Sequence, residues 1–278
     1  MANRYWLGVS GDWTATANWS TTRYGAGGSA APTSSDDVYI LDGDIDITSN
    51  ITAVAAQSIR IGGNFSASIG GSGTAMTVNT AACPITIENV ATGKTIAIGA
   101  DAAVTISGIV RIRSTGGGTV TLASGAAGVI TTVRCGRQGR VIVSSSAAVT
   151  NLYSGGIRIT AEPSSTAFTL LELRGGGNAV ASHDIRRACT TLTVTNGAVA
   201  RNYNSVAVTT ANVESQGTVF HDSDGTVGTL NAFPAGVFKS GATAFAITNA
   251  NIWQGSTTPP EGGRVTYTNT PEFYGDVG

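Results

Sequence analysis

The chain has 278 residues, of which 41% are hydrophobic, 12% are charged and 37 are glycine, and its net charge is −1. This balance excludes an intrinsically disordered protein, and the lack of a Gly-x-y period and of Leu-rich heptads excludes collagen and coiled coils. No run of about 18 apolar residues predicts a transmembrane helix. The N-terminus lacks the basic and apolar regions of a secretory signal, so we expect synthesis without export.

The composition favours strands and turns over helices. Thr, Val and Ile are abundant, Gly, Asn and Ser supply turn residues, and helix-forming Glu, Lys and Gln are scarce. Strand-like runs occur, in chain order, at 38–41, 45–47, 58–61, 76–78, 85–88, 95–98, 104–106, 109–113, 119–122, 129–134, 140–143, 149–152, 157–160, 168–173, 190–194, 206–209, 218–221, 237–239, 245–248 and 265–268. Many alternate apolar and polar residues, which indicates one buried and one solvated face.

The number and spacing of these runs predict the fold class. About twenty short strands are too many for one ordinary sandwich. A parallel β-helix has coils of roughly 20 to 25 residues, which fits the spacing of the runs. We therefore predict an all-β protein, a right-handed parallel β-helix or solenoid with an N-terminal cap. Stacked β-sandwich domains are the alternative.

Three regions differ in composition. Residues 1–36 hold three of the four tryptophans and are predicted to form an N-terminal cap or anchoring arm. Residues 37–250 form the repetitive solenoid body. Residues 251–278, which are richer in proline, are predicted to be an extended C-terminal tail. Caps are expected because the open ends of a solenoid expose unpaired backbone and apolar side chains.

Two groups of acidic residues are candidates for chemistry. Asp42, Asp44 and Asp46 alternate along the chain, with Asp36 and Asp37 near by. On one strand face they could hold Ca²⁺, or they could form a turn followed by a solvated strand face. The segment 221–224, His-Asp-Ser-Asp, is either a catalytic or ligand set or a turn that runs into glycine. Nucleophile-elbow, Walker and dinucleotide motifs are absent, so we predict no enzyme, no cofactor and no metal site.

Cysteine and arginine residues give two further expectations. Cys83, Cys135 and Cys189 are odd in number and too widely spaced for a zinc site, so we expect reduced, buried thiols. Residues 61–201 carry a charge of +6 between segments of −3 and −4. Within this basic region, Arg134, Arg137 and Arg140 lie close together without aromatic neighbours. They favour contacts with a protein partner over nucleic acid.

The N-terminal segment carries a resemblance. It contains Trp6, Gly-Asp-Trp ending at Trp13, Asn-Trp-Ser around Trp19, and a Pro-x-x-x-Asp-x-Val stretch over 32–38. These roughly 40 residues resemble the opening of tailed-bacteriophage virion structural proteins, which are β-rich and begin with a Trp-rich segment. A related opening precedes the β-helical repeats of bacterial surface adhesins, although the lack of a signal argues against an adhesin.

The resemblance implies a non-enzymatic virion protein assembled in the host bacterial cytoplasm. We expect a capsid decoration or head-fibre protein that binds the major capsid protein or other virion proteins, forms a homo-oligomer such as a trimer, and contacts neither nucleic acid nor membrane. The residues predicted to anchor it are Trp6, Trp13, Trp19, Arg134, Arg137 and Arg140. The alternative is a tail fibre or tailspike that binds a host-surface glycan.

Overall fold

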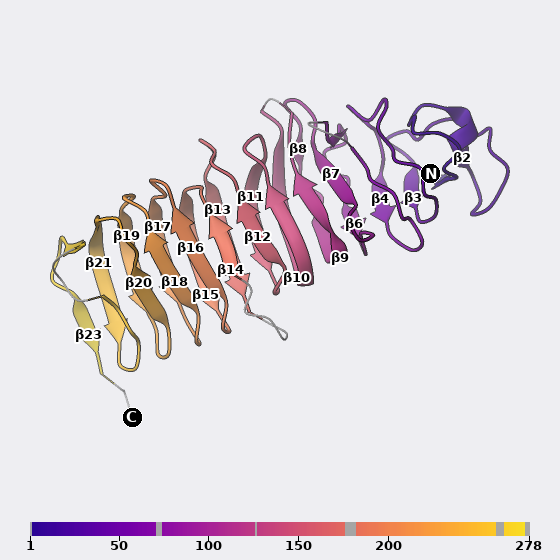
Figure 1. Cartoon of the computed structure of the whole chain (residues 1–278). Coiled ribbons are helices and arrows are strands. Elements are labelled where there is room, and N and C mark those ends of the chain that lie inside the picture. The colour runs from indigo at the N-terminus through magenta and orange to yellow at the C-terminus, as the bar shows by residue number, and fades with distance from the viewer. Residues whose placement is uncertain (1, 71–73, 126, 176–181, 260–263, 276–278) are drawn as a thin grey trace. The chain divides into compact units, whose positions relative to one another are not determined.

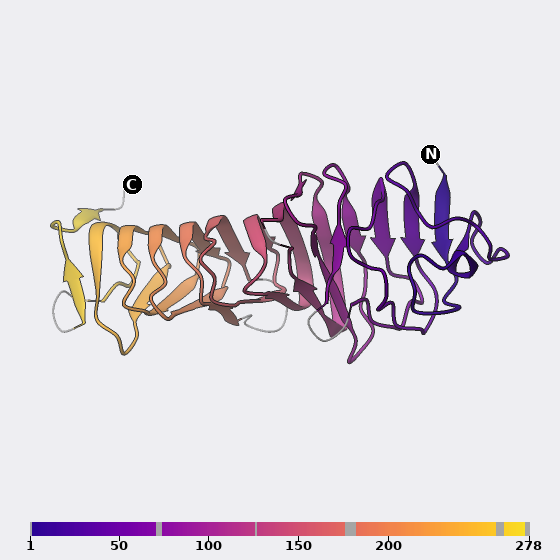
Figure 2. The same ribbon diagram turned by 90° about the horizontal axis from the view of Figure 1, so that it is seen from above.

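The computed structural model describes residues 2–70, 74–125, 127–175, 182–259 and 264–275. The chain is 51% strand and 1% helix, and its parallel coils stack into a β-solenoid of about 11 turns. This architecture confirms the predicted all-β parallel solenoid and rules out stacked sandwiches. The chain divides into two compact units, unit 1 (Met1–Val149) and unit 2 (Thr150–Gly278). Figure 1 and Figure 2 show strands of successive coils side by side within each unit.

Unit 1 is built on one continuous parallel sheet. Its elements are β1 (Asn3–Trp6), η1 (Thr16–Asn18), β2 (Trp19–Ser20), β3 (Asp37–Ile40), β4 (Ser58–Ile61), β5 (Met76–Val78), β6 (Ile85–Ile87), β7 (Thr95–Ala100), β8 (Thr105–Ile106), β9 (Val110–Leu122) and β10 (Val129–Val143). Strands β1, β3, β4, β6, β9 and β10 pair in that order, all parallel. Successive coils therefore place equivalent residues above one another.

The core of unit 1 consists of columns of aliphatic side chains. Val38, Ile59, Ile85, Val110 and Val133 are aligned partners in successive strands, and none is more than 1% exposed. These positions are 21 to 26 residues apart in the chain. Each side chain contacts its equivalents in the coils on either side, so the solenoid is filled by small residues despite the low aromatic content.

Unit 2 repeats the same plan with shorter coils. Its strands are β11 (Ala148–Ser154), β12 (Arg158–Ala161), β13 (Phe168–Arg174), β14 (Ser182–Ile185), β15 (Cys189–Thr195), β16 (Val199–Tyr203), β17 (Val208–Val213), β18 (Thr218–Asp222), β19 (Val227–Ala232), β20 (Val237–Ser240), β21 (Phe245–Trp253), β22 (Val265–Tyr267) and β23 (Glu272–Tyr274). Leu152, Leu171, Leu192, Ala211 and Leu230 form one core column, with partners 19 to 21 residues apart.

The two ends of the chain differ from the predicted arm and tail. β1 pairs with β3 as part of the parallel sheet, while β2 returns antiparallel to β1. At the other end, β22 and β23 both pair in parallel with β21, and Val265 and Tyr267 are buried. The described residues of this range, 251–259 and 264–275, therefore do not form the predicted extended tail, because Val265 and Tyr267 are buried and β22 and β23 add to the parallel sheet.

Candidate functional site

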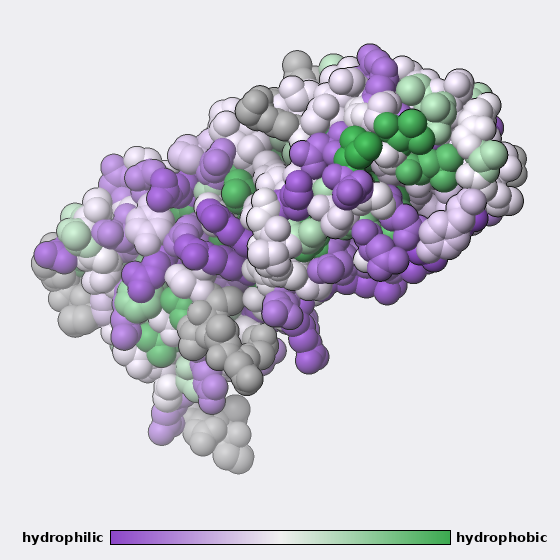
Figure 3. Space-filling view, turned by 45° about the vertical axis from the view of Figure 1, so that its right-hand side comes forward, coloured by the Kyte–Doolittle hydropathy of each residue, from purple (hydrophilic) through white to green (hydrophobic). Residues whose placement is uncertain are grey.

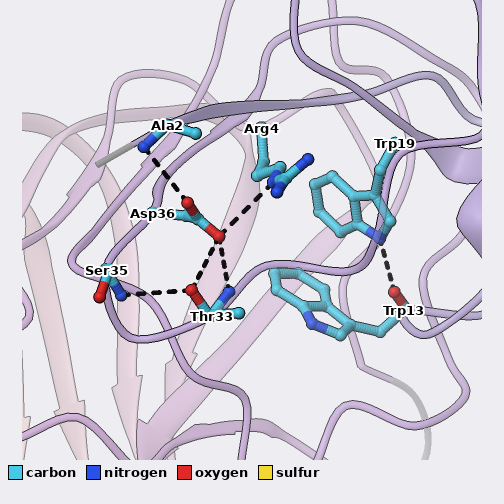
Figure 4. A network of polar contacts seen from close by, with 7 residues as sticks. All are labelled: Ala2, Arg4, Trp13, Trp19, Thr33, Ser35 and Asp36. Carbon is cyan, nitrogen blue, oxygen red and sulfur yellow. Dashed lines mark hydrogen bonds and ion pairs between the residues drawn. The ribbon is translucent and has the colours of Figure 1, made fainter.

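The three N-terminal tryptophans form a buried cluster. Trp6, Trp13 and Trp19 are 2%, 3% and 0% exposed. Trp19 packs edge-on against Trp6 and Trp13, with ring centroids 5.2 and 4.8 Å apart, and its Nε1 donates to the Trp13 carbonyl at 2.6 Å (Figure 4). Such pairs stabilise a fold beyond the area they bury. The prediction that these indoles anchor a partner is corrected, because their burial leaves almost no ring surface for one.

Asp36 fastens the N-terminal segment to the solenoid. The residue is 5% exposed. Its carboxylate accepts hydrogen bonds from the Thr33 amide at 3.0 Å and from the Thr33 hydroxyl at 2.9 Å (Figure 4). It also accepts from the Ala2 amide at 3.3 Å and pairs with Arg4 at 3.5 Å. Burial alone would raise the pKa of Asp36, but the Thr33 and Arg4 contacts hold it below the usual value. The Pro-x-x-x-Asp-x-Val stretch therefore has a structural role.

The remaining aspartates of this region do not converge. Residues 42–46 form no strand; in the predicted run 45–47, Ile47 makes a single bridge to Ile69. Asp42 binds Arg23, whereas Asp46 accepts from the Ser68 amide at 2.7 Å. Among the described residues, no three His, Cys, Asp or Glu side chains group as metal ligands do. The idea of one shared strand face for Asp42, Asp44 and Asp46 is therefore wrong.

The polar cluster at 221–224 is divided between the core and the surface. His221 on β18 is fully buried, and its Nε2 lies 2.8 Å from the Gly225 carbonyl. The next side chain, Asp222, points to the other face and accepts from the Ala242 amide at 2.7 Å. Because neighbouring strand residues face opposite sides, these groups cannot act on one substrate. The segment forms a strand end and a bend, as the turn interpretation predicted.

The cysteines are core residues. Cys83, Cys135 and Cys189 are free and buried, and Cys135 ends a column of four isoleucines. Burial raises the pKa of each thiol to about 12, so all three are protonated at neutral pH. This confirms their interpretation as small buried hydrophobic residues.

The three arginines predicted to act together lie on different stretches of β10. Arg134 is aligned with Arg111 on β9, whereas Arg140 is aligned with Thr119. Two register shifts separate these stretches, and Arg137 is exposed between them. The expectation of one Arg134–Arg137–Arg140 anchoring group is therefore corrected, because the register shifts in β10 separate Arg134, on the sheet that begins with β1, from Arg140.

On that sheet the structure joins Arg134 to arginines that are distant in the sequence. The register aligns Tyr39, Arg60, Thr86, Arg111 and Arg134 in successive strands, with their side chains on the outer face. Arg113 lies two residues beyond Arg111 and is therefore on the same face. We call Arg60, Arg111, Arg113 and Arg134 the arginine face. Glu88 lies among them and accepts from Arg60 at 2.8 Å and Arg113 at 3.4 Å.

The electrostatics of the arginine face favour an acidic partner. Arg60 and Arg113 have side chains that are 51% and 67% exposed. Arg111 and Arg134 are both exposed and directly aligned, and like charges in such positions destabilise a sheet. No ion pair among the described residues includes Arg111. A carboxylate placed between the two guanidinium groups would offset this repulsion and accept bidentate hydrogen bonds.

Sequence reasoning missed Arg60, Arg111 and Arg113 as site residues. The alternation of 110–113 did place Arg111 and Arg113 on the solvated side of a strand, and Arg134 follows Arg111 by about one coil. This spacing was the available signal, but it gains meaning only when the strand register is known.

The fold and this face define a β-solenoid protein with a cationic outer surface. Comparisons with protein-family models, curated proteins and solved structures give no match. Within the described ranges, no helix has both the length and the apolar character needed to cross a membrane.

Proposed function

We propose that the protein is a non-enzymatic structural protein of a bacteriophage virion, a capsid decoration or head-fibre protein that binds the major capsid protein through the arginine face. The alignment of Arg111 with Arg134 on a rigid sheet, beside Arg60 and Arg113, is the observation that carries this proposal. The resemblance of residues 1–40 to phage virion proteins supports the biological setting.

The mechanism is binding energy delivered by a preorganised surface. Parallel strands hold equivalent side chains at about 4.8 Å intervals, so the partner meets guanidinium groups at fixed positions. Carboxylates on the partner would form charge-assisted hydrogen bonds with these guanidinium groups. A protein that binds only the assembled shell stabilises that shell by mass action. We expect the bound form to be a homo-oligomer such as a trimer.

The test uses capsids that lack this protein and the purified chain. We expect the wild-type chain to bind such capsids and raise their melting temperature. The double variant Arg111→Ser/Arg134→Ser should bind at least about tenfold more weakly, because two charge-assisted contacts are lost. A matched control, Arg158→Ser/Arg174→Ser, removes the same charge from exposed positions in unit 2 and should bind like wild type.

Two results would contradict the proposal. One is the absence of binding at saturating protein, and the other is an equal loss in the control variant. Binding to host cells instead of capsids would favour the alternative, a tail fibre or tailspike that recognises a host-surface glycan.

A further inference from the structure

Strand β23 in unit 2 has a free edge within the described part of the chain. It pairs with β21, which aligns Ile252 with Phe273 and Trp253 with Tyr274 (Figure 1). The Gln254 amide donates to the Tyr274 carbonyl at 3.0 Å, so this carbonyl points toward β21. Backbone directions alternate along a strand, and the amide and carbonyl of Phe273 therefore point to the free edge. Such an edge is a template for pairing with another strand.

Phe273 also ends an apolar core column. The register aligns, in successive strands, Val194, Val213, Ala232, Ile252 and Phe273. The first four are at most 8% exposed, whereas Phe273 is 74% exposed. The last ring of this column therefore leaves apolar area in water that one more coil would cover.

A row of aromatic rings on the outer face ends at the same strand. Phe233, Trp253 and Tyr274 stack, with ring centroids 4.5 and 4.7 Å apart and planes at 20° and 17°. Tyr274 is 40% exposed, and its hydroxyl donates to the Glu272 carboxylate at 2.6 Å. β23 therefore presents one aromatic ring on each face, together with a hydroxyl donor and a carboxylate acceptor.

The first strand of unit 1 differs, because neither of its edges is free. Tyr5 and Tyr39 are aligned on β1 and β3, and their rings stack with centroids 4.9 Å apart. The other edge of β1 is occupied by β2, which aligns Ser20 with Tyr5 and the fully buried Trp19 with Trp6. A second copy could not add its β23 to β1 without displacing β2. This leaves the free edge of β23 to pair with itself.

We propose that β23 pairs antiparallel with β23 of a second copy, about a two-fold axis through Phe273. Phe273 then lies opposite its equivalent, and the two residues exchange two backbone hydrogen bonds. Glu272 lies opposite Tyr274 of the second copy, so a carboxylate faces a hydroxyl and the two like charges are not adjacent. Both Phe273 rings stay on the core side and both Tyr274 rings on the outer side. A two-fold parallel pairing would put the Phe273 rings on opposite faces.

The contact is small and closes on itself. Each copy contributes a three-residue strand with two aromatic rings, which is less than an ordinary stable interface. We expect a dissociation constant on the order of 100 μM. A two-fold contact doubles the mass of the free particle, whether that particle is one chain or a larger homo-oligomer. The inference goes beyond capsid binding and uses no residue of the arginine face.

Analytical ultracentrifugation of the whole chain from about 10 μM to 1 mM tests the pairing. We expect the mass of the wild-type particle to double over this range. Phe273→Lys places a charge at the centre of the pair and should keep the lower mass, with unchanged thermal unfolding. Apolar surface also occurs in unit 1, where Figure 3 shows hydrophobic residues beside hydrophilic ones. Tyr24→Lys, at a 73% exposed residue of unit 1, is the matched control and should double in mass.

A cross-link tests the register. Paired residues that exchange two hydrogen bonds have Cα atoms about 5.5 Å apart, which is within the reach of a disulfide. Phe273→Cys should therefore form a covalent dimer under mild oxidation at least about tenfold faster than Tyr24→Cys does. The native cysteines, Cys83, Cys135 and Cys189, are buried and should not compete.

The proposal is overturned if the wild-type chain keeps one mass up to about 1 mM, or if Phe273→Lys doubles in mass as the wild type does. Growth without limit would indicate a head-to-tail contact and would contradict the two-fold axis. Equal cross-linking rates for the two cysteine variants would contradict the register. Arg111→Ser/Arg134→Ser should still double in mass, so a failure of self-pairing and a failure of capsid binding can be told apart.

Discussion

The two units stack similar coils but carry different outer side chains. In the core column that begins at Val38 in unit 1, aligned partners are 21 to 26 positions apart, whereas in the column that begins at Leu152 in unit 2 they are 19 to 21 apart. Elsewhere in unit 2 the spacing is less even, because Ala161 and Ile185 are 24 positions apart and His183 and Ala200 are 17 apart. Unit 1 places arginines and tyrosines on its outer face. Unit 2 instead repeats similar polar residues from coil to coil. The coils from β15 to β21 have partners 19 to 20 positions apart, and this near-constant length permits ladders of identical side chains. Coils of variable length supply the loops from which sites are built.

The clearest ladder of unit 2 is made of asparagines. Asn212, Asn231 and Asn251 are aligned partners. Asn251 donates to Asn231 and Asn231 donates to Asn212, both at 2.8 Å, and Asn212 donates to Thr193 at 3.3 Å. Amide ladders of this kind stabilise stacked parallel strands. No equivalent amide ladder occurs among the described residues of unit 1.

The largest expected effect tests whether both units depend equally on their core columns. Ile87→Ala in unit 1 and Leu192→Ala in unit 2 each remove a side chain that is 0% exposed. We expect each change to lower the free energy of unfolding by about 3 kcal/mol, because a cavity is left between neighbouring coils. Urea unfolding followed by circular dichroism measures this loss. The change Thr190→Ala, at an exposed residue of β15, is the control, and a loss below about 1 kcal/mol for either core variant would contradict the expectation.

Low pH should destabilise unit 2 more than unit 1, because both histidines lie in unit 2. His183 is fully buried, its Nδ1 accepts from the Ile159 amide at 3.1 Å, and burial is the main cause that lowers its pKa to about 4. The unfolded chain, with a pKa near 6.5, then binds the proton more readily than the folded chain does. The contribution of neutral His183 to the free energy of unfolding is therefore fully present above pH 6.5. It falls by up to about 3 kcal/mol as the pH drops to 4.

Hydrogen exchange at pH 7 and pH 4.5 measures this difference. We expect β14 and β16 to lose protection while β4 and β6 keep theirs, because the pKa values of Asp36 and Asp42 are lowered and these carboxylates stay ionised at pH 4.5. His183→Gln should reduce the pH dependence. An unchanged profile in that variant, or equal loss in both units, would remove His183 as the cause.

A smaller effect concerns the asparagine ladder. Asn231→Ala removes one donated and one accepted hydrogen bond, so we expect a loss of about 1 to 2 kcal/mol in the free energy of unfolding. Thr229→Ala, two residues earlier on the same face of β19, is the matched control and should cost about 0.5 kcal/mol or less. Equal costs for the two variants would show that the ladder contributes nothing specific.

The smallest expected effect is a gain in stability in unit 1. Arg111→Gln removes one of two like charges that the strand register aligns, and we expect it to stabilise the free chain by a few tenths of a kcal/mol at low salt. The gain should vanish in about 1 M salt, where the screening length is about 3 Å. Chemical unfolding at both salt concentrations checks this. A destabilised variant at low salt would mean that Arg111 has a structural role.

The sequence predicted what depends on local pattern. Alternation identified the strand at 157–160, seen as β12, and the inward Val110 and Ile112 of β9. The position of one coil relative to the next depends on contacts between residues about 20 positions apart, which no local pattern encodes. The Arg111–Arg134 alignment and the Tyr5–Tyr39 stack could therefore not be predicted from the sequence.

Burial at the two ends was the other failure. Aromatic content cannot tell an exposed anchor from a packed cluster, because tryptophan serves both purposes. The indoles of Trp6, Trp13 and Trp19 were assigned to a surface for this reason. At the C-terminal end, prolines suggested a tail, although Val265 and Tyr267 continue the core columns.

The asparagine ladder also gives unit 2 a direction. Each amide of the ladder donates toward the preceding coil, from Asn251 to Asn231, from Asn231 to Asn212 and from Asn212 to Thr193. The amide dipoles therefore point the same way and polarise one another, much as peptide groups do along a helix. Removing one rung interrupts this mutual polarisation, so its neighbours weaken as well. A row of three asparagines and one threonine thus links four coils through aligned dipoles, independently of the apolar columns inside.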